Sequence, residues 1–355
     1  MRLSARSWPV RAGIALGVGL AMLVGASAAF AVPTITGAGA TAPQILYQQW
    51  ASNYQKTAKV NYQGVGSGAG INAIEAGTVN FGASDQPLAR SGGTPPTLNG
   101  TPKLVQFPSC IEGIVAIVNM GAKAGKLHLT GAVLAQIYLG KITKWNDSRI
   151  KSLNPGLNLP NKPITVIHRS DKSGTTYIFT MYLKKAYSGW TRQGMLISWP
   201  TGLGYAKSSG VAGAVKSRPY SIGYVEYTWA VTQHIAYAQM KNASGKWVMP
   251  TEKTFAAAGA HAKYTWSNGF ATNLENMKGA TAWPITGETY ILVRRSQSSY
   301  TAAHNMLKFF NWAFTSTTGV SDAKKLTFVP LPKAAITAIK SCWHANIKAG
   351  SKPCW

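Results

Sequence analysis

The sequence predicts an α/β fold, and three observations support this prediction. Short apolar runs typical of strands alternate along the chain with segments whose apolar residues recur at helical spacing. Apolar residues make up 46% of the 355 residues, which is enough to bury a sizeable core. No segment repeats at a fixed period. Such alternation is typical of a largely parallel sheet, and a chain of this length corresponds to about two domains of roughly 150 residues each.

Strands are expected where an apolar run is bounded by turn residues. The expected strands cover residues 34–36, 60–62, 79–81, 113–119, 164–167, 222–226 and 290–293. The apolar run at 113–120 is far shorter than the roughly 20 residues that cross a bilayer. We therefore interpret these runs as buried strands.

Helices are expected between these strands. Pro43 suits the first position of a helix, and Leu46, Trp50 and Tyr54 follow it at spacings of four residues. A second helix begins after Thr175 and places Ile178, Met181 and Tyr182 on one face. The stretch at 91–102 is rich in Gly and Pro, which favours a loop between elements.

The first 31 residues have the pattern of a cleaved secretory signal. Arg2, Arg6 and Arg11 precede a charge-free apolar run at 12–25, and Ala29-Phe30-Ala31 provides a cleavage site. The alternative is an N-terminal membrane anchor, but the run is shorter than the roughly 20 residues that a spanning helix needs. We therefore expect cleavage near Ala31 and an exported, periplasmic, water-soluble product that begins near Val32.

The chain is strongly basic. Its 36 Lys and Arg against 10 Asp and Glu give a formal charge of +26, and loss of residues 1–31 removes three Arg and no acid, which leaves +23. This charge attracts anionic partners of any size. The basic residues are dispersed and accompany no nucleic-acid-binding signature, so nucleic acid is not an expected partner. Steering of small anions and adaptation to the surroundings are both compatible with the charge.

The three cysteines indicate no metal site. Cys342 and Cys354 lie 12 residues apart near the C-terminus, where oxidising conditions outside the cytoplasm allow a disulfide; the alternative is two unpaired thiols. Cys110 is expected to be a small buried hydrophobic residue. No Cys or His spacing matches a metal motif, and no pattern calls for a cofactor.

Three turns of small residues follow expected strands and precede expected helices. They are Gly37-Ala38-Gly39-Ala40-Thr41-Ala42-Pro43, Gly66-Ser67-Gly68-Ala69-Gly70 and Ser173-Gly174-Thr175-Thr176. The first N–H groups of a helix have no partner within the helix, and the helix dipole is positive there, so a compact anion binds well. Any one of these turns also suits an ordinary N-cap. Three in one chain favour an anion site.

Charged residues at two of the strand ends support this interpretation. Asp85 ends the segment 79–85, and the carboxyl ends of strands are where α/β proteins bind ligands. Arg169 and Asp171 directly precede the Ser173 turn. The planar guanidinium of Arg169 can bind two oxygens of an oxyanion, and Asp171 can hold it in place.

These residues belong to a series of motifs that occur in order along the chain. The motifs are Ile35-Thr36-Gly37-Ala38-Gly39-Ala40-Thr41, Asn61-Tyr62-Gln63-Gly64-Val65-Gly66-Ser67, Phe81-Gly82-Ala83-Ser84-Asp85, Arg169-Ser170-Asp171-Lys172-Ser173-Gly174-Thr175 and Ile222-Gly223-Tyr224-Val225-Glu226-Tyr227. With them the chain closely resembles the phosphate-binding proteins of bacterial phosphate ABC transporters (PstS type). The resemblance covers essentially the whole chain after residue 31.

The resemblance implies a two-lobed periplasmic-binding-protein (Venus flytrap) fold with a hinge between the lobes. Lobe I would comprise residues 32–115 and 290–355, and lobe II residues 116–289. The protein would be a monomer without enzymatic activity that binds inorganic phosphate between the lobes and delivers it to membrane-embedded ABC permease subunits. The phosphate ligands would be Thr41, the backbone of Ala42, Ser67, Asp85, Arg169, Ser173, Gly174 and Thr175, with Asp171 orienting Arg169.

The chain departs from the commonest family pattern in two of these motifs. Ala42 stands where the family often has Phe, and Gly68-Ala69 replaces a Ser-Gly pair, which removes one hydroxyl.

A rival interpretation also exists, because Gly64-x-Gly66-x-x-Ala69 follows a strand and Asp85 lies about 20 residues on, as in a dinucleotide fingerprint. The alternative function is therefore an exported dinucleotide-binding oxidoreductase, although the helix expected after Gly70 is short for this fold.

Overall fold

Eight strands of the described chain form one mixed sheet. The structure is a computed structural model that describes residues 32–88, 103–121 and 124–355. Across the sheet the strands are β2 (Lys59–Gly64), β1 (Thr34–Gly39), β3 (Phe81–Ser84), β11 (Thr286–Arg294), β4 (Leu104–Asn119), β8 (Ser221–Glu226), β6 (Thr165–Arg169) and β7 (Leu203–Tyr205). The predicted signal sequence at 1–31 and the predicted loop at 91–102 lie outside the described residues.

The sheet is parallel at its two ends and antiparallel in its middle. β2, β1 and β3 are mutually parallel, as are β8, β6 and β7. The pairs β3–β11, β11–β4 and β4–β8 are antiparallel. The prediction of a largely parallel sheet is therefore wrong for the central strands. β4 and β11 run in opposite directions beside each other, and β4 pairs with β11 up to Gly113 and with β8 from Ile114 onward.

Each predicted strand is present with bounds that differ from the prediction, and in two strands the difference has a local reason. β3 begins at Phe81 because Asn80, just before it, bonds through its side chain: Asn80 Oδ1 accepts from the N–H of Thr36 at 2.8 Å. β4 begins nine residues earlier than the predicted strand, at Leu104. Its sequence contains Pro108, which cannot donate a ladder hydrogen bond, and the pairing with β11 accommodates Pro108 at an irregularity beside Tyr290.

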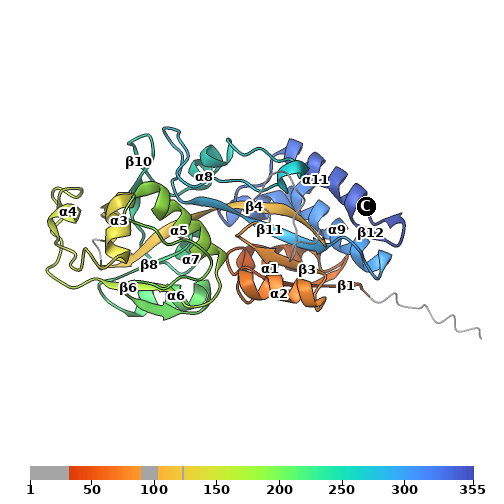
Figure 1. Cartoon of the computed structure of the whole chain (residues 1–355), viewed down its shortest axis with the longest axis horizontal. Coiled ribbons are helices and arrows are strands. Elements are labelled where there is room, and N and C mark those ends of the chain that lie inside the picture. The colour runs from red at the N-terminus through yellow and green to blue at the C-terminus, as the bar shows by residue number, and fades with distance from the viewer. Residues whose placement is uncertain (1–31, 89–102, 122–123) are drawn as a thin grey trace, which may run out of the picture. The chain divides into compact units, whose positions relative to one another are not determined.

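Helices cover the sheet on both halves of the strand order (Figure 1). α1 buries Leu46, Trp50 and Tyr54 as predicted, with Pro43 at its N-cap, and the indole N–H of Trp50 donates to the carbonyl of Gly319 at 2.9 Å. The helices are α1 (Gln44–Tyr54), α2 (Ser67–Ala76), α3 (Gly131–Tyr138), α4 (Ser148–Lys151), α5 (Gly174–Ala186), α6 (Lys207–Ser217), α7 (Tyr227–Thr232), α8 (Glu252–Gly259), α9 (Tyr300–Thr315), α10 (Thr317–Lys325) and α11 (Lys333–Asn346).

The buried apolar side chains gather in two large clusters. One surrounds β1, β3, β11 and helices α1, α9 and α11; the other surrounds the second half of β4, β8 and helices α3, α5 and α6. Phe270, which falls in the predicted lobe II, packs in the cluster of β1 and α9. Residues 32–355 nevertheless form one compact unit by their contacts, so the lobe boundaries stay a prediction.

The remaining elements lie outside the large sheet. β5 (His128–Leu129), β9 (Gln239–Lys241) and β10 (Trp247–Val248) form a three-stranded sheet, and β12 (Lys348–Ala349) pairs with β13 (Lys352–Pro353). Two short 3₁₀ helices occur at Ala124–Lys126 and Trp266–Asn268. Within the ranges that the structure describes, we find no helix with the length and apolar character needed to cross a bilayer.

The two C-terminal cysteines are buried free thiols, so the structure does not contain the disulfide that the sequence allowed. Each cysteine is held by contacts of its own. The Cys342 sulfur lies 3.7 Å from Nδ2 of Asn346, one helical turn further along α11. The backbone N–H of Cys354 donates to the carbonyl of Ile347 at 2.9 Å across the β12–β13 hairpin.

Candidate functional site

The N-terminus of α5 is the centre of the candidate site. β6 ends at Arg169, and Ser173 is the N-cap of α5, its hydroxyl accepting from the N–H of Thr176 at 3.1 Å. Gly174 and Thr175, the first two residues of the helix, are buried. Because the first N–H groups of a helix lack partners within it, this turn presents donors and a positive dipole end to the buried side chains that face it.

The second small-residue turn meets this helix end. Ser67 begins α2, and its hydroxyl oxygen accepts from the N–H of Gly174 at 3.1 Å and from the N–H of Asp85 at 3.3 Å. A Cβ atom on Gly174 would lie 2.5 Å from Oγ of Ser67 and 2.6 Å from Oδ2 of Asp85. Glycine at position 174 is therefore required by the close approach of these two side chains.

The first small-residue turn reaches the same place from the end of β1. Thr41 is buried, and its hydroxyl lies 2.8 Å from that of Ser208 near the start of α6. Ser208 Oγ also accepts from Nη1 of Arg169 at 3.4 Å. The indole N–H of Trp229 donates to the carbonyl of Thr41 at 3.1 Å, and Ala42 beside it is fully buried.

Arg169 is held in one orientation by a bidentate ion pair. Its Nε donates to Oδ1 of Asp171 at 2.7 Å and its Nη2 to Oδ2 at 2.6 Å, while its Nη1 reaches Oγ1 of Thr175 at 3.4 Å. Burial disfavours the charge on both groups, but the pair outweighs it: the pKa of Arg169 is raised and that of Asp171 is lowered. Nη1 thus remains directed at the turns while Asp171 fixes the rest of the guanidinium.

Asp85 lies at the end of β3 in a setting that favours its protonated form. Burial, followed by repulsion from Glu226, raises the pKa of Asp85 from 3.8 to about 7, although the hydroxyl of Thr289 donates to its Oδ1 at 2.7 Å. An acid with a pKa near neutrality can exchange a proton with a bound oxyanion.

The structure thus brings all of the predicted ligand residues into one buried cluster, together with four neighbours that were not predicted from the sequence. Ser208 bonds to both Thr41 and Arg169, Thr289 bonds to Asp85, Glu226 accepts from the hydroxyl of Thr175, and Glu112 is buried nearby. Ser208 follows β7 in a further small-residue turn, so the rule that found Ser67 and Ser173 applies to it also.

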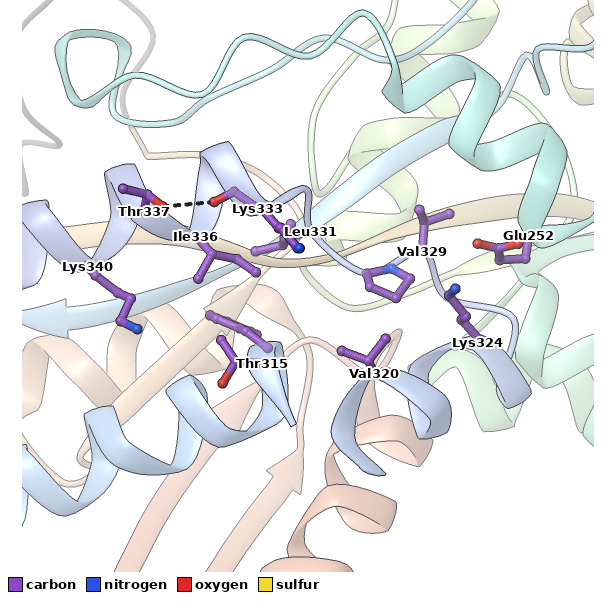
Figure 2. A pocket seen from close by; sticks show the side chains of 12 residues that line it. Glu252, Thr315, Val320, Lys324, Val329, Leu331, Lys333, Ile336, Thr337 and Lys340 are labelled. Atoms are coloured by element: carbon purple, nitrogen blue, oxygen red, sulfur yellow. Dashed lines mark hydrogen bonds between the residues drawn. The ribbon is translucent and has the colours of Figure 1, made fainter. Parts of the chain in front are cut away.

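A separate cavity of about 650 Å³ opens beside α10 and α11 (Figure 2). It contains none of the predicted phosphate ligands. Its lining is apolar with three lysines and one acid: Glu252, Phe314, Thr315, Val320, Lys324, Val329, Pro330, Leu331, Lys333, Ile336, Thr337 and Lys340. Elsewhere in the described ranges, no group of three or more His, Cys, Asp or Glu side chains has the arrangement of a metal site.

The mixed α/β sheet with two cores, and a donor-rich cluster built from both ends of that sheet, define a two-lobed solute-binding protein. Residues 24–317 match the family model described as the PBP superfamily domain. A solved structure titled as the high-affinity periplasmic phosphate-binding protein PfluDING bound with phosphate superposes with a TM-score of 0.71 at 24% identity, covering 89% of this chain and 96% of that one. This likeness establishes the two-lobed fold.

Sequence relatives define the family more narrowly. The phosphate-binding protein PstS of Haemophilus influenzae is 45% identical over 321 residues, which cover 89% of this chain and 94% of that protein. PstS of Pasteurella multocida is 43% identical over 329 residues, covering 91% of this chain and 93% of that protein. The chain therefore belongs to the PstS family of phosphate-binding proteins.

Proposed function

We propose that this protein binds inorganic phosphate in the cluster around the N-terminus of α5. The ligands would be Thr41, the backbone of Ala42, Ser67, Asp85, Arg169, Ser173, Gly174 and Thr175. The observation that carries the proposal is the buried guanidinium of Arg169, which Asp171 orients toward the α5 N-terminus and toward Ser208. A fixed cation, a helix N-terminus and several hydroxyls together supply what a dehydrated oxyanion needs.

Selectivity for phosphate is attributed to Asp85. Phosphate keeps at least one P–OH group at neutral pH and can donate that proton to the Asp85 carboxylate. Sulfate has no such proton, so one of its oxygens would face the ionised Asp85 carboxylate without a hydrogen bond between them. We therefore infer that sulfate is rejected.

Binding would draw two parts of the chain together. Thr41, Ser67 and Asp85 come from the first part, whereas Arg169, Ser173 to Thr175 and Ser208 come from the second. The change of strand partner along β4 at Gly113 and Ile114, and the start of β11 at Thr286, are where we place the hinge. Hydrogen bonds between the two parts, such as Thr41 to Ser208 at 2.8 Å, are those that closure would form.

The role beyond binding is inferred from the family. We propose that the protein is exported by way of residues 1–31, acts as a monomer outside the cytoplasm and passes phosphate to the membrane subunits of an ABC transporter, without catalysing a reaction. The mature formal charge of +23 would favour encounter with anions.

Calorimetry on phosphate-stripped protein tests the proposal. Phosphate and arsenate should bind, whereas sulfate and NAD should give no heat above dilution. Binding of NAD without phosphate would instead favour the oxidoreductase alternative. Nothing in the fold supports that alternative, because the strand that carries its glycine motif, β2, lies at the edge of the sheet rather than beside the centre where dinucleotide folds place it.

A further inference from the structure

Acidic residues are concentrated around the candidate site of a basic protein. The whole chain has only 10 Asp and Glu. Asp85, Glu112 and Glu226 are each at most 2% exposed, and Asp171 is paired with Arg169 in the same region. Acids scattered at random would not gather at a site for an anion, so these side chains require an explanation.

The strand register places three of the carboxyl groups on one face of the sheet. Residues directly opposite in an antiparallel pair share a face, and successive residues along a strand alternate faces. Glu112 lies opposite Gly287, two residues before Thr289, whose hydroxyl donates to Asp85. Glu226 lies opposite Ile114, two residues after Glu112. Asp85, Glu112 and Glu226 therefore follow one another across β3, β11, β4 and β8 on the same face.

Glu112 is the member of this row without a partner. Both of its carboxyl oxygens are buried, and no described residue forms a hydrogen bond or ion pair with them. The nearby Thr289 has one hydroxyl proton and donates it to Asp85. Arg169 is the cation of this region, and its Nε and Nη2 are already bonded to Asp171.

A buried glutamate on the other face of the sheet, Glu288, shows how hydrogen-bond donors compensate a buried carboxyl group. Glu288 alternates in β11 with Gly287 and Thr289, and it accepts hydrogen bonds from Tyr264, Thr272 and Tyr290, the last at 2.7 Å. Glu112 has none of these donors. An ionised carboxylate there would be an uncompensated buried charge, which is strongly unfavourable.

Most of the groups around Glu112 favour its neutral form. Burial, then the carboxylates of Asp85 and Glu226, then Glu288, raise its pKa well above the ordinary value, against a smaller opposing effect of Thr289. Cys110 and Tyr62 are its other titratable neighbours. A charged Glu112 raises the pKa of both groups and so favours their neutral forms. A bound phosphate would add further negative charge to this region.

We propose that Glu112 is a proton-holding residue of the phosphate site, neutral whenever phosphate is bound, so that its ionisation at alkaline pH expels phosphate. This inference rests on the proposed phosphate function and adds to it a proton linkage. The acid–base step is balanced: the carboxylic O–H of Glu112 loses its proton to solvent as phosphate leaves, and regains one from solvent when phosphate binds.

The test compares wild type with Glu112→Gln, which is isosteric with the neutral acid and cannot ionise. The phosphate Kd of both proteins is measured by calorimetry from pH 5 to pH 9 at fixed ionic strength. Titration of phosphate itself affects both proteins equally. The ratio of the wild-type Kd to the variant Kd therefore reports the effect of Glu112 ionisation on phosphate affinity. We expect a ratio near one at pH 5 that rises at least tenfold by pH 9. Glu75→Gln, which removes an exposed acid that is not among the groups acting on Glu112, is the control and should give a wild-type-to-variant ratio that does not change with pH.

A ratio for Glu112→Gln that is constant across this range overturns the proposal. If the variant does not fold, the wild-type protein alone tests the proposal. Calorimetric titrations at pH 9 in two buffers of different ionisation enthalpy should then show proton uptake on phosphate binding. Absence of proton uptake would also overturn the proposal. Wild type that binds no phosphate at any pH would instead refute the proposed function.

Discussion

Asp85→Asn should flatten the pH dependence of stability in phosphate-free protein. Burial, then Glu226, raises the pKa of Asp85 from 3.8 to about 7, so between these values the folded state holds a proton that the unfolded chain has lost. The stabilisation is complete below pH 3.8 and is lost as pH rises to about 7. At about 1.4 kcal/mol per pKa unit, wild type should lose roughly 4 kcal/mol from this residue alone across that window.

The assay is urea unfolding at half-unit steps from pH 4 to pH 7.5 in phosphate-free buffer of fixed ionic strength. Asp147→Asn is the control, because its partner Arg149 lowers the pKa of Asp147 to about 2 and Asn also caps a helix. The Asp147 carboxylate is therefore ionised in the folded protein throughout the window. Slopes that are equal in wild type and Asp85→Asn would refute the assignment of a raised pKa to Asp85.

Substitutions at three positions, Arg169, Gly174 and Ser208, test the geometry of the site by calorimetry. Arg169→Ala should weaken phosphate binding by about 2 kcal/mol or more because a buried anion loses its cation. Arg169→Lys should restore only part of that affinity. Unchanged phosphate affinity of the alanine variant would count against a ligand role for Arg169. Gly174→Ala should weaken binding at least about tenfold with an unchanged circular dichroism spectrum, because its Cβ would lie 2.5 Å from Ser67 Oγ. Ser208→Ala should cost about 1 kcal/mol by removing the 2.8 Å bond to Thr41, and unchanged affinity would mean that this bond does not contribute to closure.

Local sequence predicts the parts of the site that depend on neighbouring residues. A small-residue turn before a helix is visible as Ser173-Gly174-Thr175, and the structure has an N-cap at Ser173 and a helix from Gly174. The position of Glu112 depends instead on the register of β4 with β11 and β8, whose partners are more than 100 residues away in the sequence. The first half of β4 was not predicted because it contains Pro108, and a proline argues against a central strand.

The distribution of charge between surface and interior connects the basic composition to the site. Six of the 10 acids are at most 7% exposed (Asp85, Glu112, Glu226, Glu275, Glu288 and Asp322), whereas Arg169 is the one buried cation of the described residues. The surface is therefore more basic than the formal charge suggests, which favours capture of anions. The buried acids at the site have the opposite effect, because their carboxylates repel anions when they are ionised.

This division also sets the response of the protein to acid. Acidification protonates carboxyl groups, but Asp85, Glu112 and Glu288 have raised pKa values, so proton uptake at these positions stabilises the folded state. The stability contributed by Asp147 and Asp171, whose pKa values are lowered, is present above the unfolded value near 3.8 and is lost only as pH falls toward the folded values. We therefore expect the denaturant midpoint to be maintained or to rise as pH falls from 5 to about 3.8. A collapse of the midpoint already at pH 5 would show instead that repulsion among the surface cations outweighs the buried acids.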